Sequence, residues 1–324
     1  MPFIFFLLIL FSFNLYSNEN LTHDTVEQVV VIGVRPGPEL WKISNGENVL
    51  WILGTLSPLP KKMVWHSQLV EARLEDSQAL LLPAYATAEM GFFKKLSLVS
   101  SVIGIQKNPN GKKLKDIIPE DLYARWVILK KKYVGNNRGI EKIRPIFAAQ
   151  ELFQKAVKKI GLVFDAGIEK RIRKIAKKNK LEFITPKVTL DIKKPKAAIK
   201  KFKKSEMNDL DCFATTLDRL EVDIKAMRQR ANAWAYGDIA KIKALKYPDQ
   251  NKSCGNAFLN TDVAQDTGIT ELPERLRNAW LEAAKKSLSK NKSTFAILPI
   301  SILLKSNGYL DFLAAQGYTI EVPK

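Results

Sequence analysis

The chain has 324 residues, of which 46% are hydrophobic and 26% charged, so it holds enough apolar side chains for a substantial core and is not globally disordered. Its length favours one large domain or two closely associated ones. Only two histidines are present, His23 and His66, which excludes a metal site built from several imidazoles, and the formal net charge is +19.

The amino-terminal segment is apolar from residue 2 to residue 13 and ends in small residues near Ser17. A helix that spans a bilayer needs about 20 apolar residues, so this run has the length of a signal-peptide core. We expect residues 1–17 to be a cleaved signal peptide and residues 18–28 a flexible leader; an uncleaved anchor or a buried strand is the alternative. No later run is long enough to span a membrane, so we expect an exported protein, periplasmic or secreted.

Short strands and helices alternate in the amino-terminal half. Asn45-Gly46 separates two apolar runs and is typical of a hairpin turn. Asp165 is expected to cap a helix whose apolar stripe is Ile168, Ile172 and Ile175. The patterns predict strands at 29–32, 40–43, 49–53, 79–82 and 181–184, and helices at 67–75, 122–133 and 144–160.

The most regular segment is an apolar stripe with spacings of three and four between Leu210 and Trp234. It predicts one long helix near 206–236 that buries the stripe in the core and stops at Gly237. Later helices are predicted at 273–288 and 309–315, and strands at 294–298 and 318–322. The predicted fold is α/β, with a central mixed sheet built from amino- and carboxy-terminal strands, flanked by many helices, in one domain over 29–324.

Positive charge is concentrated in one third of the chain. Residues 104–204 contain 29 Lys and Arg against 9 Asp and Glu, a net charge of +20, so the remainder is close to neutral. Such a surface favours anionic partners in a salt-dependent manner, and we expect an anionic lipid or polysaccharide. The lysine clusters are not interleaved with aromatic rings as in a base-stacking platform, so nucleic acid is the weakest candidate. A solvated surface without a ligand is the alternative.

The two cysteines, Cys212 and Cys254, are separated by two helical stretches that can form a hairpin. In an exported chain we expect them to form a disulfide. Two separate buried thiols are the alternative.

Known catalytic motifs are missing. The sequence contains no Walker loop, no GxSxG and no GxGxxG. His66 is the only histidine of the expected folded domain and therefore the only histidine that could act as a general base. Its sequence context, Val64-Trp65-His66-Ser67, is more typical of the start of a helix. Abundant lysines leave Ser–Lys chemistry open without identifying a pair.

Several short motifs occur in a characteristic order. Gly54-Thr55-Leu56 follows a predicted strand, with Ser57 next in sequence. Further motifs are Arg144-Pro145, Gly161-Leu162 with Gly167-Ile168-Glu169, Ala233-Trp234 with Gly237-Asp238, Arg277-Asn278 and Gly317-Tyr318. Together they resemble the TraB/GumN family, relatives of the Tiki metalloproteases. The resemblance extends over most of the chain and implies metal-dependent hydrolase ancestry.

The same resemblance implies that four polar positions of the family's active cleft are replaced. Ser57 and Ser301 stand where the family has histidines. Pro83 stands where an acid is expected after a strand, and Pro186 falls in the family's L-E pair. None of the four is a good side-chain ligand for a divalent metal. We therefore predict a degenerate metal site and no cofactor.

The leading hypothesis is a catalytically silent TraB/GumN-like envelope protein that binds an anionic component. One alternative is a hydrolase with shifted chemistry, in which Ser57 or Ser301 is the nucleophile and a lysine the base. Arg277 and Asn278 are retained from the family's motif and are weak catalytic candidates. The other alternative is a structural or assembly partner without a ligand; no protein partner is indicated.

Overall fold

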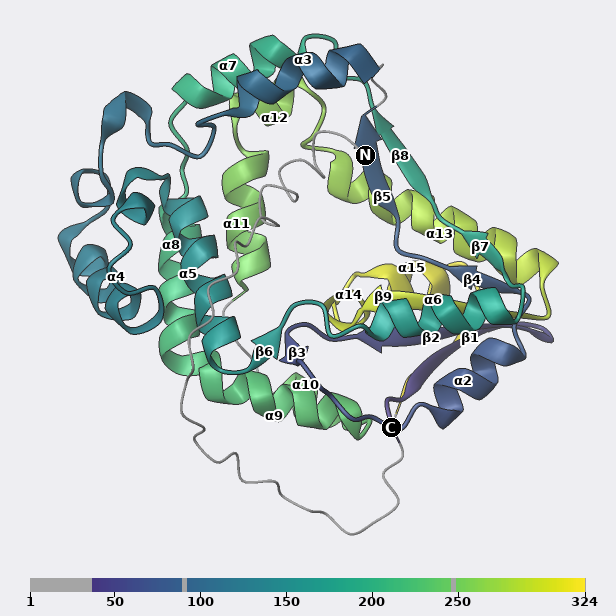
Figure 1. Cartoon of the computed structure of the whole chain (residues 1–324). Helices are drawn as coiled ribbons and strands as arrows, with labels where there is room; N and C mark the ends of the chain where they lie inside the picture. The colour runs from purple at the N-terminus through teal and green to yellow at the C-terminus, as the bar shows by residue number, and fades with distance from the viewer. Residues whose placement is uncertain (1–36, 89–91, 246–248, 324) are drawn as a thin grey trace.

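The computed structural model describes residues 37–88, 92–245 and 249–323 (Figure 1). Its centre is a six-stranded mixed sheet with the strand order β10-β1-β2-β9-β4-β7. The strands are β1 Leu40–Asn45, β2 Asn48–Thr55, β4 Ala79–Leu81, β7 Glu182–Ile184, β9 Ser293–Pro299 and β10 Thr319–Glu321. The predicted sheet of amino- and carboxy-terminal strands is confirmed, and β7 from the middle of the chain completes it.

The sheet has an antiparallel and a parallel half. β1 pairs antiparallel with both β10 and β2, and the predicted Asn45-Gly46 hairpin joins β1 to β2. β2, β9, β4 and β7 run parallel to one another. Their carboxyl ends therefore lie along one edge of the sheet, the place where open parallel sheets present functional loops.

The main core lies on the two faces of this sheet. Residues of β2, β9 and β4 such as Leu50, Leu80 and Phe295 are fully buried, and Trp234 and Trp280 from two helices join them. The helices that contribute to this core are α2 Gln68–Glu75, α6 Ile168–Lys178, α9 Ile224–Ala235, α10 Ile239–Ala244, α13 Leu272–Lys290, α14 Ile300–Leu303 and α15 Tyr309–Ala314.

A second, helical core lies beside the sheet. Trp126, Leu152 and Phe213 are fully buried in it, and the Trp126 and Phe213 ring centroids are 5.3 Å apart. Its helices are α4 Glu120–Tyr133, α5 Pro145–Lys159 and α8 Leu210–Asp218, with α11 Gln250–Leu259 packed on α8. This core belongs to the basic third of the chain and the helix that follows it.

Smaller clusters occupy the far end of the molecule. There a parallel pair of strands and three helices surround residues such as Val188, Leu190 and Phe202 (Figure 1). The elements are β5 Tyr85–Ala88, β8 Lys187–Leu190, α3 Phe92–Val102, α7 Pro195–Lys204 and α12 Asp262–Asp266. A short antiparallel pair, β3 Leu59–Pro60 with β6 Leu162–Val163, ties the chain after β2 to the segment before α6.

The predicted long helix is present, but it is not regular. It starts at Leu210 rather than near 206, and residues 219–223 form a π turn between α8 and α9. Asp223 in this turn is buried and accepts a 2.6 Å hydrogen bond from Arg230 Nη2. The apolar stripe is buried in the core, as predicted. The spacing of apolar residues does not predict the π turn or the buried polar residues in it.

The disulfide between Cys212 and Cys254 is confirmed, with the two Cα atoms 4.5 Å apart. It joins α8 to α11 across the predicted helical hairpin. The expected signal peptide, flexible leader and strand at 29–32 lie outside the described residues, as does His23. Among the helices that are described, none is both long and apolar enough to cross a membrane.

Candidate functional site

The four positions that the family resemblance predicts to be replaced occupy equivalent places in the sheet. Ser57 and Ser301 each lie two residues beyond the paired strand ends Thr55 and Pro299. Pro83 and Pro186 each lie two residues beyond the paired ends of β4 and β7, Leu81 and Ile184. The structure thus brings all four to the carboxyl edge of four adjacent parallel strands. Their former role as a metal site stays a prediction.

The two prolines mark a joint in the sheet. The β4–β7 ladder continues to the bond from Leu82 N to Ile184 O, then resumes as β5 with β8, where Tyr85 N donates to Pro186 O. A proline has no amide hydrogen to donate, so Pro83 and Pro186 interrupt the ladder where the two strands leave the six-stranded sheet. Their position is explained by backbone structure.

Ser57 is exposed, and its hydroxyl already has a partner. Its Oγ donates a 2.9 Å hydrogen bond to the carbonyl oxygen of Phe164, and the peptide bond to Pro58 is cis. Ser301 is the exposed second residue of α14. Within the described ranges, no hydrogen bond joins either serine to a lysine. The arrangement is that of a loop anchor at Ser57 and a surface residue at Ser301.

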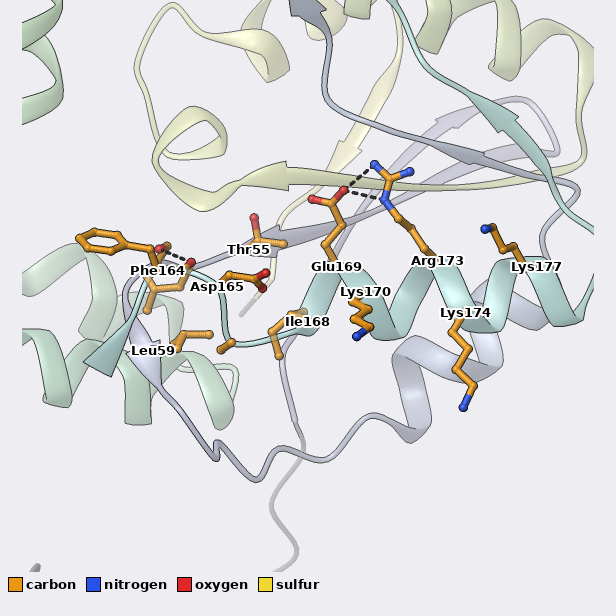
Figure 2. Close-up of a pocket in the computed structure, with 13 residues that line it drawn as sticks. Thr55, Leu59, Phe164, Asp165, Ile168, Glu169, Lys170, Arg173, Lys174 and Lys177 are labelled. Atoms are coloured by element: carbon orange, nitrogen blue, oxygen red, sulfur yellow. Dashed lines mark hydrogen bonds and ion pairs between the residues drawn. The ribbon is translucent and has the colours of Figure 1, made fainter. Parts of the chain in front are cut away.

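A cavity of about 750 Å³ opens beside the end of β2, between the β2–β3 loop and α6 (Figure 2). We name it the α6 cavity. It is lined by Thr55, Leu56, Ser57, Leu59, Phe164, Asp165, Ala166, Ile168, Glu169, Lys170, Arg173, Lys174 and Lys177. Ser57 is the only one of the four replaced positions among these lining residues.

Helix α6 supplies most of the charge in this cavity. Its buried residues Ile168, Ile172 and Ala176 pack on the sheet core, which turns its polar residues outward. The helix begins after Gly167, whose φ of 79° is in the left-handed region. Asp165 was predicted to cap it, and that prediction is wrong: Asp165 Oδ1 accepts from Gly167 N at 2.8 Å and closes the preceding turn instead.

The lining holds four cations and two carboxylates, a formal net charge of +2. Arg173 is paired with Glu169 one turn away, at 2.5 Å. Lys170, Lys174 and Lys177 have no carboxylate partner in the part of the chain that is described. Figure 2 shows Glu169, Arg173 and Lys177 along one side of the polar face and Lys170 and Lys174 along the other. The cavity therefore offers three open ammonium groups to a ligand.

The residues at this edge do not fit a resident metal ion. Of the lining side chains only Asp165 and Glu169 are typical ligands, and Glu169 is held by Arg173. Over residues 37–88, 92–245 and 249–323, no group of three or more His, Cys, Asp and Glu side chains is arranged to hold a metal. His66 is exposed and lies outside the cavity, next to the start of α2.

Arg277 and Asn278 lie on α13, away from the α6 cavity. The Arg277 guanidinium stacks 4.4 Å from the centroid of the Phe312 ring and contacts Glu274 at 3.2 Å. Asn278 is exposed and accepts a 3.4 Å bond from Arg277 Nε. The contact with Phe312 braces α13 against α15, while Glu274 and Asn278 lie on α13 itself.

Sequence reasoning placed the lysines of α6 on its polar faces without recognising a site. The spacing of Lys170, Lys174 and Lys177 by four and three residues indicates that their Cα atoms lie on neighbouring positions of the polar surface of the helix. The spacing does not predict that the loop after β2 approaches this helix. The β3–β6 pairing and the bond from Ser57 to Phe164 bring the loop there.

Comparison with known proteins agrees with the motif order. The sequence profile of the TraB/PrgY/gumN family matches residues 39–322. The comparisons with curated proteins and with solved structures gave no match.

Proposed function

The chain belongs to the TraB/PrgY/gumN family, and from this premise we propose that it is an exported, non-catalytic member that binds an anionic component of the cell envelope. The α6 cavity is the proposed binding site. The observation that carries the proposal is that Lys170, Lys174 and Lys177 line one cavity without a carboxylate partner among the described residues. Lys170 and Lys174 lie along one side of α6 and Lys177 along the other (Figure 2).

The geometry favours an extended ligand with several negative charges. The three lysines cover two turns of α6, about 10 Å along its axis. An exposed ion pair contributes only about 0.2–1 kcal/mol, so one anionic group would bind weakly here. A polysaccharide or a lipid surface with repeated charges would engage the lysines together, in a strongly salt-dependent manner.

The residues at the carboxyl edge of the sheet support the proposal that the protein is not catalytic. The family positions that would carry imidazole or carboxylate hold Ser57, Ser301, Pro83 and Pro186. The two prolines break a strand ladder, and the Ser57 hydroxyl is committed to Phe164 O at 2.9 Å. The disulfide supports export, since disulfides persist in oxidising compartments.

Binding is tested by replacing the three lysines with glutamine, as K170Q/K174Q/K177Q. Retention on heparin and on vesicles containing phosphatidylglycerol is measured across a salt series, and the two matrices separate a polysaccharide from a lipid ligand. We expect the triple variant to lose about tenfold or more in affinity for one of them, since three weak ion pairs are removed together. The salt dependence should flatten as well.

The matched control is K225Q/K243Q/K252Q, which removes three exposed lysines outside the basic third. It changes the net charge by the same amount and should leave retention nearly unchanged. Equal losses in both variants would mean that net charge alone is responsible. Weak retention of the wild type at all salt concentrations would contradict the proposal and favour the structural-partner alternative.

The shifted-chemistry hydrolase is a second candidate because Ser57 lines the same cavity as three lysines. Labelling with a fluorophosphonate probe, followed by mass mapping, tests it directly. Modification of Ser57 that is abolished in K170Q/K174Q/K177Q would establish this alternative. We expect no labelling of Ser57 or Ser301.

A further inference from the structure

Helices α3 and α7 form an outer surface at the far end of the molecule, and none of its residues lines the α6 cavity. The two helices lie side by side (Figure 1), and Leu98, Val102, Ile199 and Phe202 from them are buried in one apolar cluster. A lysine of α7 also ties the end of α3, because its Nζ donates a 2.6 Å hydrogen bond to the carbonyl oxygen of Ile103. The helices are therefore packed together and present a joint surface to solvent.

Two aliphatic side chains of this surface are exposed. Val99 on α3 is 47% exposed, and Ile103, directly after α3, is 72% exposed. They are spaced by four residues, which places them on the same side of the last helical turn. Leu98 and Val102, each one residue earlier, are buried instead. An exposed aliphatic pair gains free energy only where a partner offers apolar material that removes it from water.

The two segments that form this surface carry only positive charge. Residues 92–107 contain three lysines and residues 192–205 contain seven, with no Asp, Glu or Arg in either segment. Lys196, Lys200 and Lys204 on α7 are exposed and have no carboxylate partner among the described residues. Their spacing by four places them along one side of the helix. We name these three lysines, with the two exposed aliphatic residues, the α3–α7 surface.

Ion pairs hold α7 on its other side. Lys201 contacts Asp266 at 2.7 Å and Asp262 at 3.8 Å, both on α12. Lys201 and Lys203 are two residues apart, about 200° around a helix, so α12 and the end of α3 flank α7 on opposite sides. The two aspartates thus neutralise Lys201 and fix the helix, while the row of lysines in the α3–α7 surface keeps its charge.

From this combination we infer that the α3–α7 surface docks on an anionic lipid bilayer. Lysines near an anionic membrane are attracted to the lipid phosphates, and their contributions accumulate along a row. Aliphatic side chains of a helix at the membrane surface enter the boundary between head groups and acyl chains. A hydrated polysaccharide or nucleic acid offers no such apolar layer. The inference goes beyond the proposed function and does not depend on a ligand in the α6 cavity.

The first measurement reads the lysines of the full wild-type chain. The protein is acetylated briefly with and without vesicles containing phosphatidylglycerol, and the modified lysines are mapped by mass spectrometry. Lys196, Lys200 and Lys204 should react more slowly with these vesicles present, and neutral phosphatidylcholine vesicles should not protect them. Protection confined to the lysines of α6 would place the lipid at the α6 cavity and overturn the inference.

The variant V99S/I103S separates a bilayer from a polyanion. It should lower the affinity for phosphatidylglycerol vesicles by about tenfold, because two aliphatic side chains no longer leave water. Retention on heparin should stay unchanged. V127S/V222S is the matched control, since Val127 on α4 and Val222 in the π turn are 44% and 71% exposed. All four residues are exposed, so neither variant opens the core.

The charge of the surface is tested with K196Q/K200Q/K204Q. It should lose about tenfold or more in affinity for the same vesicles, with a flatter salt dependence. K225Q/K243Q/K252Q again controls for net charge. The inference is overturned if the wild type does not bind the vesicles, or if V99S/I103S binds them as tightly as V127S/V222S. An α6 cavity without a ligand would leave each of these outcomes unchanged, so either proposal can fail alone.

Discussion

Trp234 on α9 donates a 2.6 Å hydrogen bond from its indole Nε1 to the carbonyl oxygen of Gly54 near the end of β2. Both groups are buried, and the Trp41 ring packs so closely on Gly54 that a Cβ there would lie 2.6 Å from it. The long helix is thereby fixed to the strand that leads into the α6 cavity. The Gly54-Thr55 and Ala233-Trp234 motifs, far apart in sequence, meet at this bond.

The first prediction concerns this bond. W234F should lower the free energy of unfolding by about 1–3 kcal/mol beyond the cost of the smaller ring, because Gly54 O is left buried without a donor. W280F is the control: Trp280 is equally buried, but its Nε1 has no partner in the described structure. Urea denaturation of both variants compares the loss of a bonded indole N–H with the loss of an unbonded one, whose removal also relieves a burial cost, so W234F should be the more destabilised. Equal losses would show that the bond contributes nothing measurable.

The second prediction concerns Glu71 on α2. Ser67 donates a 2.6 Å hydrogen bond to its carboxylate, and this bond, with the nearby Arg171, lowers the pKa of Glu71. A carboxyl with a lowered folded-state pKa stabilises the fold above its unfolded-state pKa of about 4.3, and loses this effect as the pH falls through the folded value. S67A should therefore be less stable than the wild type at pH 7 and nearly equal to it in acid.

The measurement for Ser67 is urea denaturation of the wild type and S67A at pH 7 and near pH 3, with the Glu71 carboxyl titrated by ¹³C NMR. Its pKa should rise toward the ordinary value in the variant. Q68A, one residue along and exposed, is the control and should not change the titration. A stability difference that persists unchanged in acid would contradict the assignment.

Local pattern was enough to predict most of the fold. The apolar runs and the Asn45-Gly46 turn identify the β1–β2 hairpin, and the strand at 294–298 is confirmed as β9. The stripe from Leu210 to Trp234 identifies the long helix. Each of these features depends on side-chain periodicity and turn chemistry within a few residues, which sequence displays directly.

The pattern of apolar and turn-forming residues did not predict the contacts of polar side chains that depend on residues far apart in the sequence. Asp223 in the π turn is buried and forms ion pairs with Arg230 and Arg219. Ion pairs of this kind leave no pattern of apolar residues in the sequence. The α6 cavity depends on the β3–β6 pairing and on the bond from Ser57 to Phe164, which join segments that are far apart in the sequence. Sites built by such tertiary contacts become visible only when the fold is known.

The third prediction concerns the disulfide. Denatured, unreduced protein should contain no titratable thiol, because Cys212 and Cys254 are paired and no free cysteine is present. C212S/C254S should lower the free energy of unfolding by about 4 kcal/mol, the chain-entropy estimate for a loop of this size. Urea denaturation with and without reductant measures it: reductant should weaken the wild type and leave the double variant unchanged. Two thiols per denatured chain would refute the pairing.

The last prediction concerns Glu169, whose 2.5 Å pair with Arg173 withholds one cation from the α6 cavity. E169Q should release the guanidinium and make the lining more positive, so the affinity for the retained polyanion should rise by about twofold to fivefold, the scale of one exposed ion pair. The salt dependence of retention should steepen at the same time. The control is E182Q, which opens an exposed pair with Lys290 outside the cavity and adds the same charge. An equal rise in both variants would mean that the chain attracts polyanions through its overall charge, and a fall in E169Q would mean that the carboxylate itself contacts the ligand.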